Sequence, residues 1–168
     1  MRNNAENPTI VERSDLRATR PWLALYRDVP PTLQPACATA LAMFKATAAR
    51  DPDAPLVHYF DKTLTARDCD AMSDALAVGL QARGIGRGDR VALYLQNVPQ
   101  VVVAVLAAWK CGAAIVPCNP MLRERELAKI LATSGARVLI CQEDLYGQVA
   151  RATVPSTAVE HKIGRAHV

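Results

Sequence analysis

The sequence predicts an α/β protein whose core is a small parallel β-sheet with helices on both faces. Three short apolar runs, residues 90–95, 113–117 and 137–141, have the length and composition of buried strands. Two segments with helical spacing, residues 97–110 and 123–133, lie between these runs, and the links are short. Strand, helix, strand, helix, strand in this order is typical of a parallel βαβαβ sheet with right-handed crossovers. The runs are apolar throughout, as expected of strands that are covered on both faces.

Further elements precede and follow the predicted sheet. Residues 36–50 are rich in alanine with apolar residues at helical spacing, and Asp51-Pro52-Asp53 ends that helix. Residues 56–60 form a β-prone run that turns at Asp61-Lys62 and returns at Thr63-Leu64, which predicts a short hairpin. After the third strand, residues 143–152 are expected to form a last helix.

Particular residues are expected to begin and end the helices. Thr65 caps the helix after the hairpin, and Asp68 at the third following position completes a capping box. Asn97 caps the next helix, with Pro99 in its first turn. Gly112 closes that helix, because glycine accepts the positive φ that a helix end often needs.

The composition is that of a folded protein that does not bind nucleic acid. Of the 168 residues, 51% are hydrophobic and 21% are charged, which excludes a disordered chain. The net charge is +4, but the charges are scattered and form no basic stripe. The N-terminal residues are polar and show no secretory signal. The longest apolar run, residues 101–109, is far shorter than the roughly 20 residues of a membrane-spanning helix. We therefore expect a cytoplasmic protein, for which peripheral membrane contact stays open.

The cysteines indicate buried, reduced thiols rather than a metal site. The chain has five cysteines, none of them in a C-x-x-C pair, and only His58 among the histidines lies outside the last eight residues. Several cysteines sit in apolar runs, where they act as small hydrophobic residues.

We expect three segments: a flexible tail at residues 1–20, one domain at residues 21–160, and a non-biological end at residues 161–168. Prolines between residues 21 and 35 exclude a long helix there, and Trp22 and its apolar neighbours could pin this arm to a domain surface. The last seven residues, KIGRAHV, are also one translation of the sequencing adapter AGATCGGAAGAGCACACGTC, whose next bases are a stop codon. We therefore interpret these residues, and His161 in part, as an artefact, and expect the natural chain to continue beyond about Glu160.

Residues that could carry chemistry each have a simpler structural explanation. Lys110 ends a helix, where a cation complements the helix dipole. Cys111 has no nearby histidine or cationic cluster to activate it, so we interpret it as a small buried residue. His58 lies in a hairpin strand, where it is packed or exposed rather than catalytic. Trp22 and Trp109 are interpreted as packing anchors.

The glycines in Gly84-x-Gly86-x-Gly88 are not a dinucleotide-binding motif. They follow a helix and precede a strand, which reverses the order that aims helix N–H groups at a phosphate. Pro117 and Pro120 are expected to end a strand and shape the loop after it. The sequence therefore yields no catalytic, cofactor-binding or metal-binding residue.

Several short motifs, taken in order, resemble the adenylate-forming (AMP-binding) superfamily of acyl-CoA synthetases. G-D-R-V-A at residues 88–92 precedes N-V-P at residues 97–99, and K-C-G-A-A-I-V-P-C-N-P follows at residues 110–120. Glu126-Leu127 and the strand at residues 136–140 then match the family's next helix and strand. The resemblance runs from about Arg20 to about Ala150, and the order of the motifs is more specific than any one of them.

Two regions show where the chain follows the family and where it departs. Leu64-Thr65 resembles the start of the first core motif, L-T-Y-x-E-L, but Ala66 replaces the aromatic residue and Asp68-Cys69 replaces Glu-Leu. The arm Arg20-Pro21-Trp22-Leu23, with Tyr26, Val29 and Pro30, resembles the start of long-chain fatty acid–CoA ligases.

The resemblance implies an α/β fold that is part of the N-terminal subdomain of an acyl-CoA synthetase. It implies a parent acid–thiol ligase that uses ATP, Mg²⁺ and coenzyme A to convert a fatty acid into acyl-CoA through an acyl-adenylate. The Ser/Thr/Gly-rich loop with its lysine, the T-G-D motif and the C-terminal lysine of the family are not found in this sequence. The chain alone is therefore expected to be inactive, to bind none of these cofactors, and to be marginally stable.

Two alternatives remain open. The parent could be another adenylate-forming enzyme, such as a short-chain acyl- or aryl–CoA ligase or a peptide-synthetase adenylation domain, because the acyl pocket lies outside this stretch. Alternatively, the chain could be a small α/β binding module without enzymatic activity, in which case it should bind ATP or acyl-CoA by itself. The sequence gives neither the preferred acyl chain length nor the oligomeric state.

Overall fold

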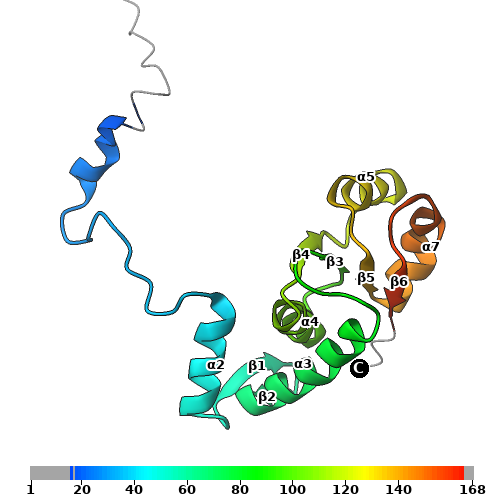
Figure 1. The fold of residues 1–168 in the computed structure, drawn as a ribbon, viewed down its shortest axis with the longest axis horizontal. Coiled ribbons are helices and arrows are strands. Elements are labelled where there is room, and N and C mark those ends of the chain that lie inside the picture. The colour runs from blue at the N-terminus through cyan, green and yellow to red at the C-terminus, as the bar shows by residue number, and fades with distance from the viewer. Residues whose placement is uncertain (1–15, 17, 165–168) are drawn as a thin grey trace, which may run out of the picture. The chain divides into compact units, whose positions relative to one another are not determined.

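The computed structural model describes residue 16 and residues 18–164, in two compact units, Met1–Ala36 and Cys37–Val168. Most of the predicted tail at residues 1–20 therefore lies outside the described residues. In the first unit, a short 3₁₀ helix, η1 (Pro21–Leu25), ends at Tyr26 (Figure 1). Its brevity agrees with the prolines that were expected to exclude a long helix between residues 21 and 35.

The second unit is built on a four-stranded parallel sheet, in the order β4-β3-β5-β6. The strands are β3 (Arg90–Tyr94), β4 (Ala114–Cys118), β5 (Val138–Cys141) and β6 (His161–Ile163). All three pairings in this sheet are parallel. The predicted βαβαβ sheet is therefore confirmed, with β3 placed between the two strands that follow it in sequence.

Helices cover both faces of the sheet and create two hydrophobic cores. On one face, the helices are α3 (Ala66–Gln81) and α4 (Pro99–Lys110). On the other face, they are α5 (Glu124–Ser134), α6 (Glu143–Leu145), η2 (Tyr146–Ala150), α7 (Arg151–Thr153) and η3 (Val154–Ser156). The result is a layer of helices, a sheet and a second layer of helices (Figure 1).

The expected burial of the strands holds for β3 and β5 but is wrong for most of β4. Four of the five residues of β3, and all of β5, are buried, whereas Cys118 alone is buried in β4. The physical reason is that, within the described residues, β4 pairs with β3 alone and lies at the edge of the sheet. Pro117, which lacks a backbone N–H, is tolerated in such an edge strand.

The remaining elements lie before the sheet in sequence. They are α2 (Ala40–Arg50), β1 (Pro55–Tyr59) and β2 (Lys62–Thr65). The two strands form the predicted antiparallel hairpin, but its turn is Phe60-Asp61 rather than Asp61-Lys62, because Tyr59 pairs with Lys62. Thr39 caps α2, because its side chain accepts a hydrogen bond from the backbone N–H of Ala42.

The capping prediction is confirmed for α3 and wrong for α4. Thr65 Oγ1 accepts from the Asp68 backbone N–H (3.1 Å) while Asp68 Oδ2 accepts from the Thr65 N–H (2.9 Å), which is a complete capping box. The N-cap of α4 is Val98, without a side-chain hydrogen bond, rather than Asn97. Pro99 occupies the first turn as expected.

Two glycines have the positive φ that their turns need. Gly112, after α4, has φ 74°, and a Cβ there would lie 3.3 Å from the Cα of Arg87. Gly135, after α5, has φ 59°, and a Cβ there would lie 2.9 Å from Arg90 Nη2. Both positions therefore favour glycine mainly for its conformation, and at Gly112 the nearby Arg87 backbone also leaves little room for a side chain.

The last predicted helix, at residues 143–152, is interrupted. The chain passes from α6 through the π-helical turn η2 into α7, which ends at Thr153. Such a π-helical turn is not visible in a pattern based on 3.6-residue spacing. Residues 161–163 form β6 beside β5, and residues 165–168 lie outside the described residues. The artefact interpretation concerns the origin of these residues and stays a prediction.

Candidate functional site

The amino-terminal edge of the sheet is closed by a network of ion pairs. Arg137 Nη1 donates to Asp89 Oδ1 at 3.1 Å, and Arg137 Nη2 donates to Glu160 Oε2 at 2.7 Å. The Gly86 backbone N–H, and then Arg137, hold the pKa of the Asp89 carboxyl below its usual value. Arg137 likewise lowers the pKa of Glu160. These charges join the starts of β3, β5 and β6, which is a structural role.

Arg90 extends this closure toward α5. Its guanidinium donates to the carbonyl oxygens of Ser134 (2.8 Å), Gly135 (2.9 Å) and Gly88 (2.8 Å). These oxygens belong to the end of α5 and to the turn before β3. The Arg90 side chain therefore satisfies backbone carbonyl groups at the end of α5 and before β3, which is a structural role.

The carboxyl-terminal edge of the sheet is the candidate functional site, because ligands of parallel α/β sheets bind at that edge. Polar residues follow the buried strands there: Gln96 and Asn97 after β3, Asn119 after β4 and Gln142 after β5. Among the described residues, the buried side-chain oxygens of Gln100 and Gln142 have no hydrogen-bond partner. These amides could receive hydrogen-bond donors from a ligand or from another segment of protein.

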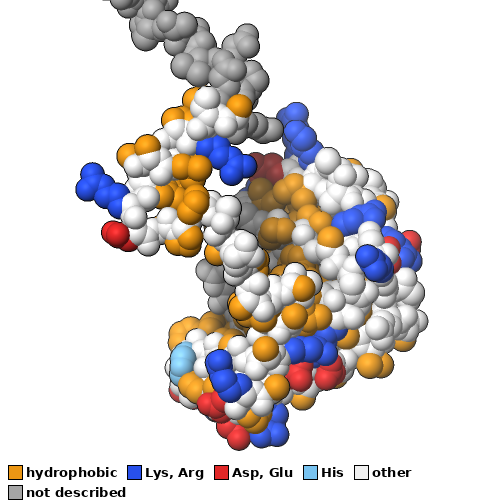
Figure 2. All heavy atoms as spheres, turned by 60° about the vertical axis from the view of Figure 1, so that its left-hand side comes forward, with side chains coloured by type: hydrophobic (Ala, Val, Ile, Leu, Met, Phe, Trp, Pro, Cys, Tyr) orange, Lys and Arg blue, Asp and Glu red, His pale blue; other side chains and the backbone are white. Residues whose placement is uncertain are grey.

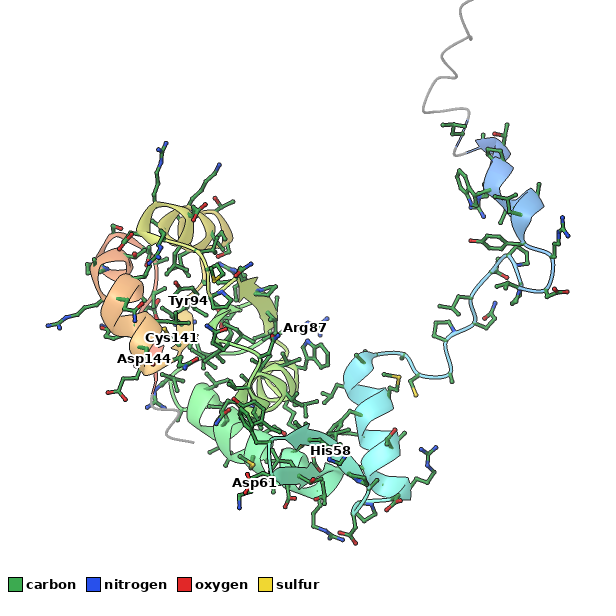
Figure 3. All side chains as sticks on the ribbon, turned by 180° about the vertical axis from the view of Figure 1, so that it is seen from behind. His58, Asp61, Arg87, Tyr94, Cys141 and Asp144 are labelled. Carbon is green, nitrogen blue, oxygen red and sulfur yellow. The ribbon has the colours of Figure 1, made fainter. Side chains whose placement is uncertain are left out.

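Three buried side chains, Tyr94, Cys118 and Cys141, lie in a row, side by side, at the last positions of the strands β3, β4 and β5. Tyr94 at the end of β3 is level with Cys118 of β4 and with Cys141 of β5, and Figure 3 shows Tyr94 and Cys141 close together. The Tyr94 hydroxyl donates to the carbonyl oxygen of Leu122 at 2.7 Å, and so fixes the loop after β4. Asn119 Oδ1 supports the same loop by accepting from the Met121 backbone N–H at 2.8 Å.

The thiols in this row are not nucleophiles. Burial raises the pKa of Cys118 to about 11 and that of Cys141 to about 12. Burial also raises the pKa of Cys111, whose Sγ lies 3.5 Å from the carbonyl oxygen of Ala77. Because a thiol reacts as the thiolate, all three are inert near neutral pH. The interpretation of Cys111 as a small buried residue is confirmed, and all five cysteines are free.

Lys110 has partners that the sequence did not predict. Its Nζ lies 2.5 Å from Asp70 Oδ1 and 2.7 Å from Asp74 Oδ1, and its side chain is only 7% exposed. Burial lowers the pKa of the ammonium, but hydrogen bonds to Asp70 and then Asp74 outweigh it and raise the pKa overall. The helix-dipole explanation is therefore incomplete, because Lys110 mainly links α4 to α3.

The other candidates fall outside the carboxyl edge. His58 Nδ1 lies 3.0 Å from Thr63 Oγ1 across the hairpin, and Figure 3 shows His58 on a different part of the second unit from Tyr94. Gly84, Gly86 and Gly88 lie between α3 and β3, which is the helix-then-strand order that the sequence predicted. Trp22 and Trp109 are 43% and 37% exposed, so each is partly buried, and their interpretation as packing anchors stays a prediction.

The described residues hold no group of three metal-ligating side chains. Within residue 16 and residues 18–164, no helix is long and apolar enough to cross a membrane. At the carboxyl edge, the side-chain oxygens of Gln100 and Gln142 are thus the buried acceptors without a partner among the described residues.

The fold has a parallel sheet between two layers of helices, with polar amides at the carboxyl ends of its strands. It is therefore an α/β domain of the class that binds ligands at these strand ends. A family profile described as AMP-binding enzyme matches residues 44–166. The chain belongs to this family of AMP-binding enzymes.

Three relatives illustrate the similarity. A long-chain-fatty-acid–CoA ligase of Bacillus subtilis is 33% identical over 132 residues, which are 78% of this chain and 24% of the relative. Surfactin synthase subunit 3 of Bacillus subtilis is 34% identical over 116 residues, 69% of this chain and 9% of the relative. A solved structure from Rhodopseudomonas palustris, assigned as a long-chain-fatty-acid CoA ligase, has a TM-score of 0.71 at 28% identity, covering 77% of this chain and 33% of its own. The chain thus spans a third or less of the length of each.

Proposed function

We propose that this chain forms the first part of the AMP-binding domain of a long-chain fatty acid–CoA ligase. The observation that carries the proposal is the 33% identity to the Bacillus subtilis ligase across 78% of the chain. The matching fold of the Rhodopseudomonas palustris protein supports it. So does the N-terminal arm around Trp22, whose sequence resembles the start of such ligases.

In the complete enzyme, the fatty acid carboxylate would attack the α-phosphate of ATP to give an acyl-adenylate and pyrophosphate. The thiol of coenzyme A would then attack the acyl carbon and release AMP. The developing phosphate charge needs cations, Mg²⁺ and backbone N–H groups. We expect the residues for this step in the rest of the enzyme, because this sequence has neither the Ser/Thr/Gly-rich loop with its lysine nor the T-G-D motif.

Within that enzyme, the present chain would act as a structural platform. Its sheet would form one side of the active site of the complete enzyme. Tyr94 and Asn119 would fix the loop after β4 through their hydrogen bonds to its backbone. The chain alone is expected to show no fatty-acid-dependent exchange of pyrophosphate into ATP. It is also expected to bind neither ATP nor acyl-CoA. Binding of either ligand by the chain alone would instead favour a small binding module without enzymatic activity.

A segment exchange tests the proposal. Residues 44–160 of this chain would replace the corresponding segment of the Bacillus subtilis ligase, and oleoyl-CoA formation would be measured. We expect the exchanged enzyme to keep activity within about tenfold of its parent, because the catalytic residues are retained and the platform is equivalent. A soluble, folded exchange enzyme that forms no acyl-adenylate would contradict the proposal.

The second candidate is a peptide-synthetase adenylation domain, which the 34% identity to surfactin synthase subunit 3 favours. The test is to exchange the same residues into an adenylation domain of that protein. We expect the surfactin exchange to lose at least about tenfold more activity than the ligase exchange. The reverse order would favour a peptide-synthetase parent over a ligase.

A further inference from the structure

No further inference is drawn: the strongest candidate, the surface of mixed hydrophobic and charged side chains at the end of the second unit that carries α2, α3 and the β1–β2 hairpin (Figure 2), carries nothing because nothing in the structure shows what covers it in a chain that spans a third or less of the length of each relative compared above.

Discussion

At the scale of single residues, Lys110 shows how a buried cation can hold two helices together. Its ammonium lies between Asp70 and Asp74 of α3, while its own backbone ends α4. The sequence predicts that Lys110 lies at a helix end. It does not predict that Lys110 pairs with Asp74 and Asp70, which are 36 and 40 residues earlier. That pairing depends on how α3 packs against α4, which spacing along one helix cannot reveal.

Replacing Lys110 by methionine should destabilise the fold by about 1–3 kcal/mol, because it leaves two carboxylates facing an apolar side chain. Chemical denaturation followed by circular dichroism would measure the free energy of unfolding. The matched variant is Lys129→Met on α5, where the lysine is exposed, and it should stay within about 0.5 kcal/mol of the unmodified chain. Equal effects of the two substitutions would show that the Lys110 cluster adds no stability.

Asp89 gives the fold an acid-sensitive contact. Its pKa is lowered in the folded chain, first by the Gly86 N–H and then by Arg137, so its contribution is present above its unfolded pKa of about 3.9. This contribution is lost as the pH falls through the lower folded value. Asp89→Asn should therefore flatten the decline of melting temperature below about pH 4. A decline that stays as steep in Asp89→Asn as in the unmodified chain would exclude a specific role for Asp89.

At the scale of elements, the sequence predicted most of the helices and strands because their signals are local. The capping box of α3 needs only Thr65 and Asp68, and the apolar runs of β3 and β5 are visible in the sequence. The exposed position of β4 could not be predicted, since it depends on which strands pair with it. The π-helical turn η2 could not be predicted either, because a pattern based on 3.6-residue spacing does not reveal it.

The α3 capping box can be tested by Thr65→Ala, which removes the side-chain acceptor of the Asp68 N–H. We expect a loss of about 1 kcal/mol in the free energy of unfolding. Thr133→Ala, at an exposed position in α5, is the comparison and should be neutral or slightly stabilising. A loss at Thr133 as large as that at Thr65 would contradict the capping assignment.

At the scale of the whole molecule, the sheet has two free edges, β4 and β6, within the described residues. Unpaired edges favour association with other chains, so the isolated 168-residue protein should be marginally stable and prone to aggregate. Light scattering and calorimetry on purified protein would measure this. A monomeric protein with a cooperative thermal transition would show that the chain is a complete folding unit.

The carboxyl edge of the sheet could be located from the sequence, because the strand order fixes which loops meet there. Its detailed arrangement could not: Tyr94 holds the Leu122 carbonyl across 28 residues, and Gln142 is buried without a partner. No catalytic residue was predicted from the sequence, and this stays a prediction.

The most direct test of the central proposal is to sequence the source DNA across and beyond the codons for Val159 to Val168. The proposal predicts that the frame continues past Glu160 into a Ser/Thr/Gly-rich loop followed by lysine, and later into T-G-D. Genomic DNA that encodes KIGRAHV and then a stop codon would contradict it. The chain would in that case be a short protein in its own right, and the ligase activity would have to be abandoned.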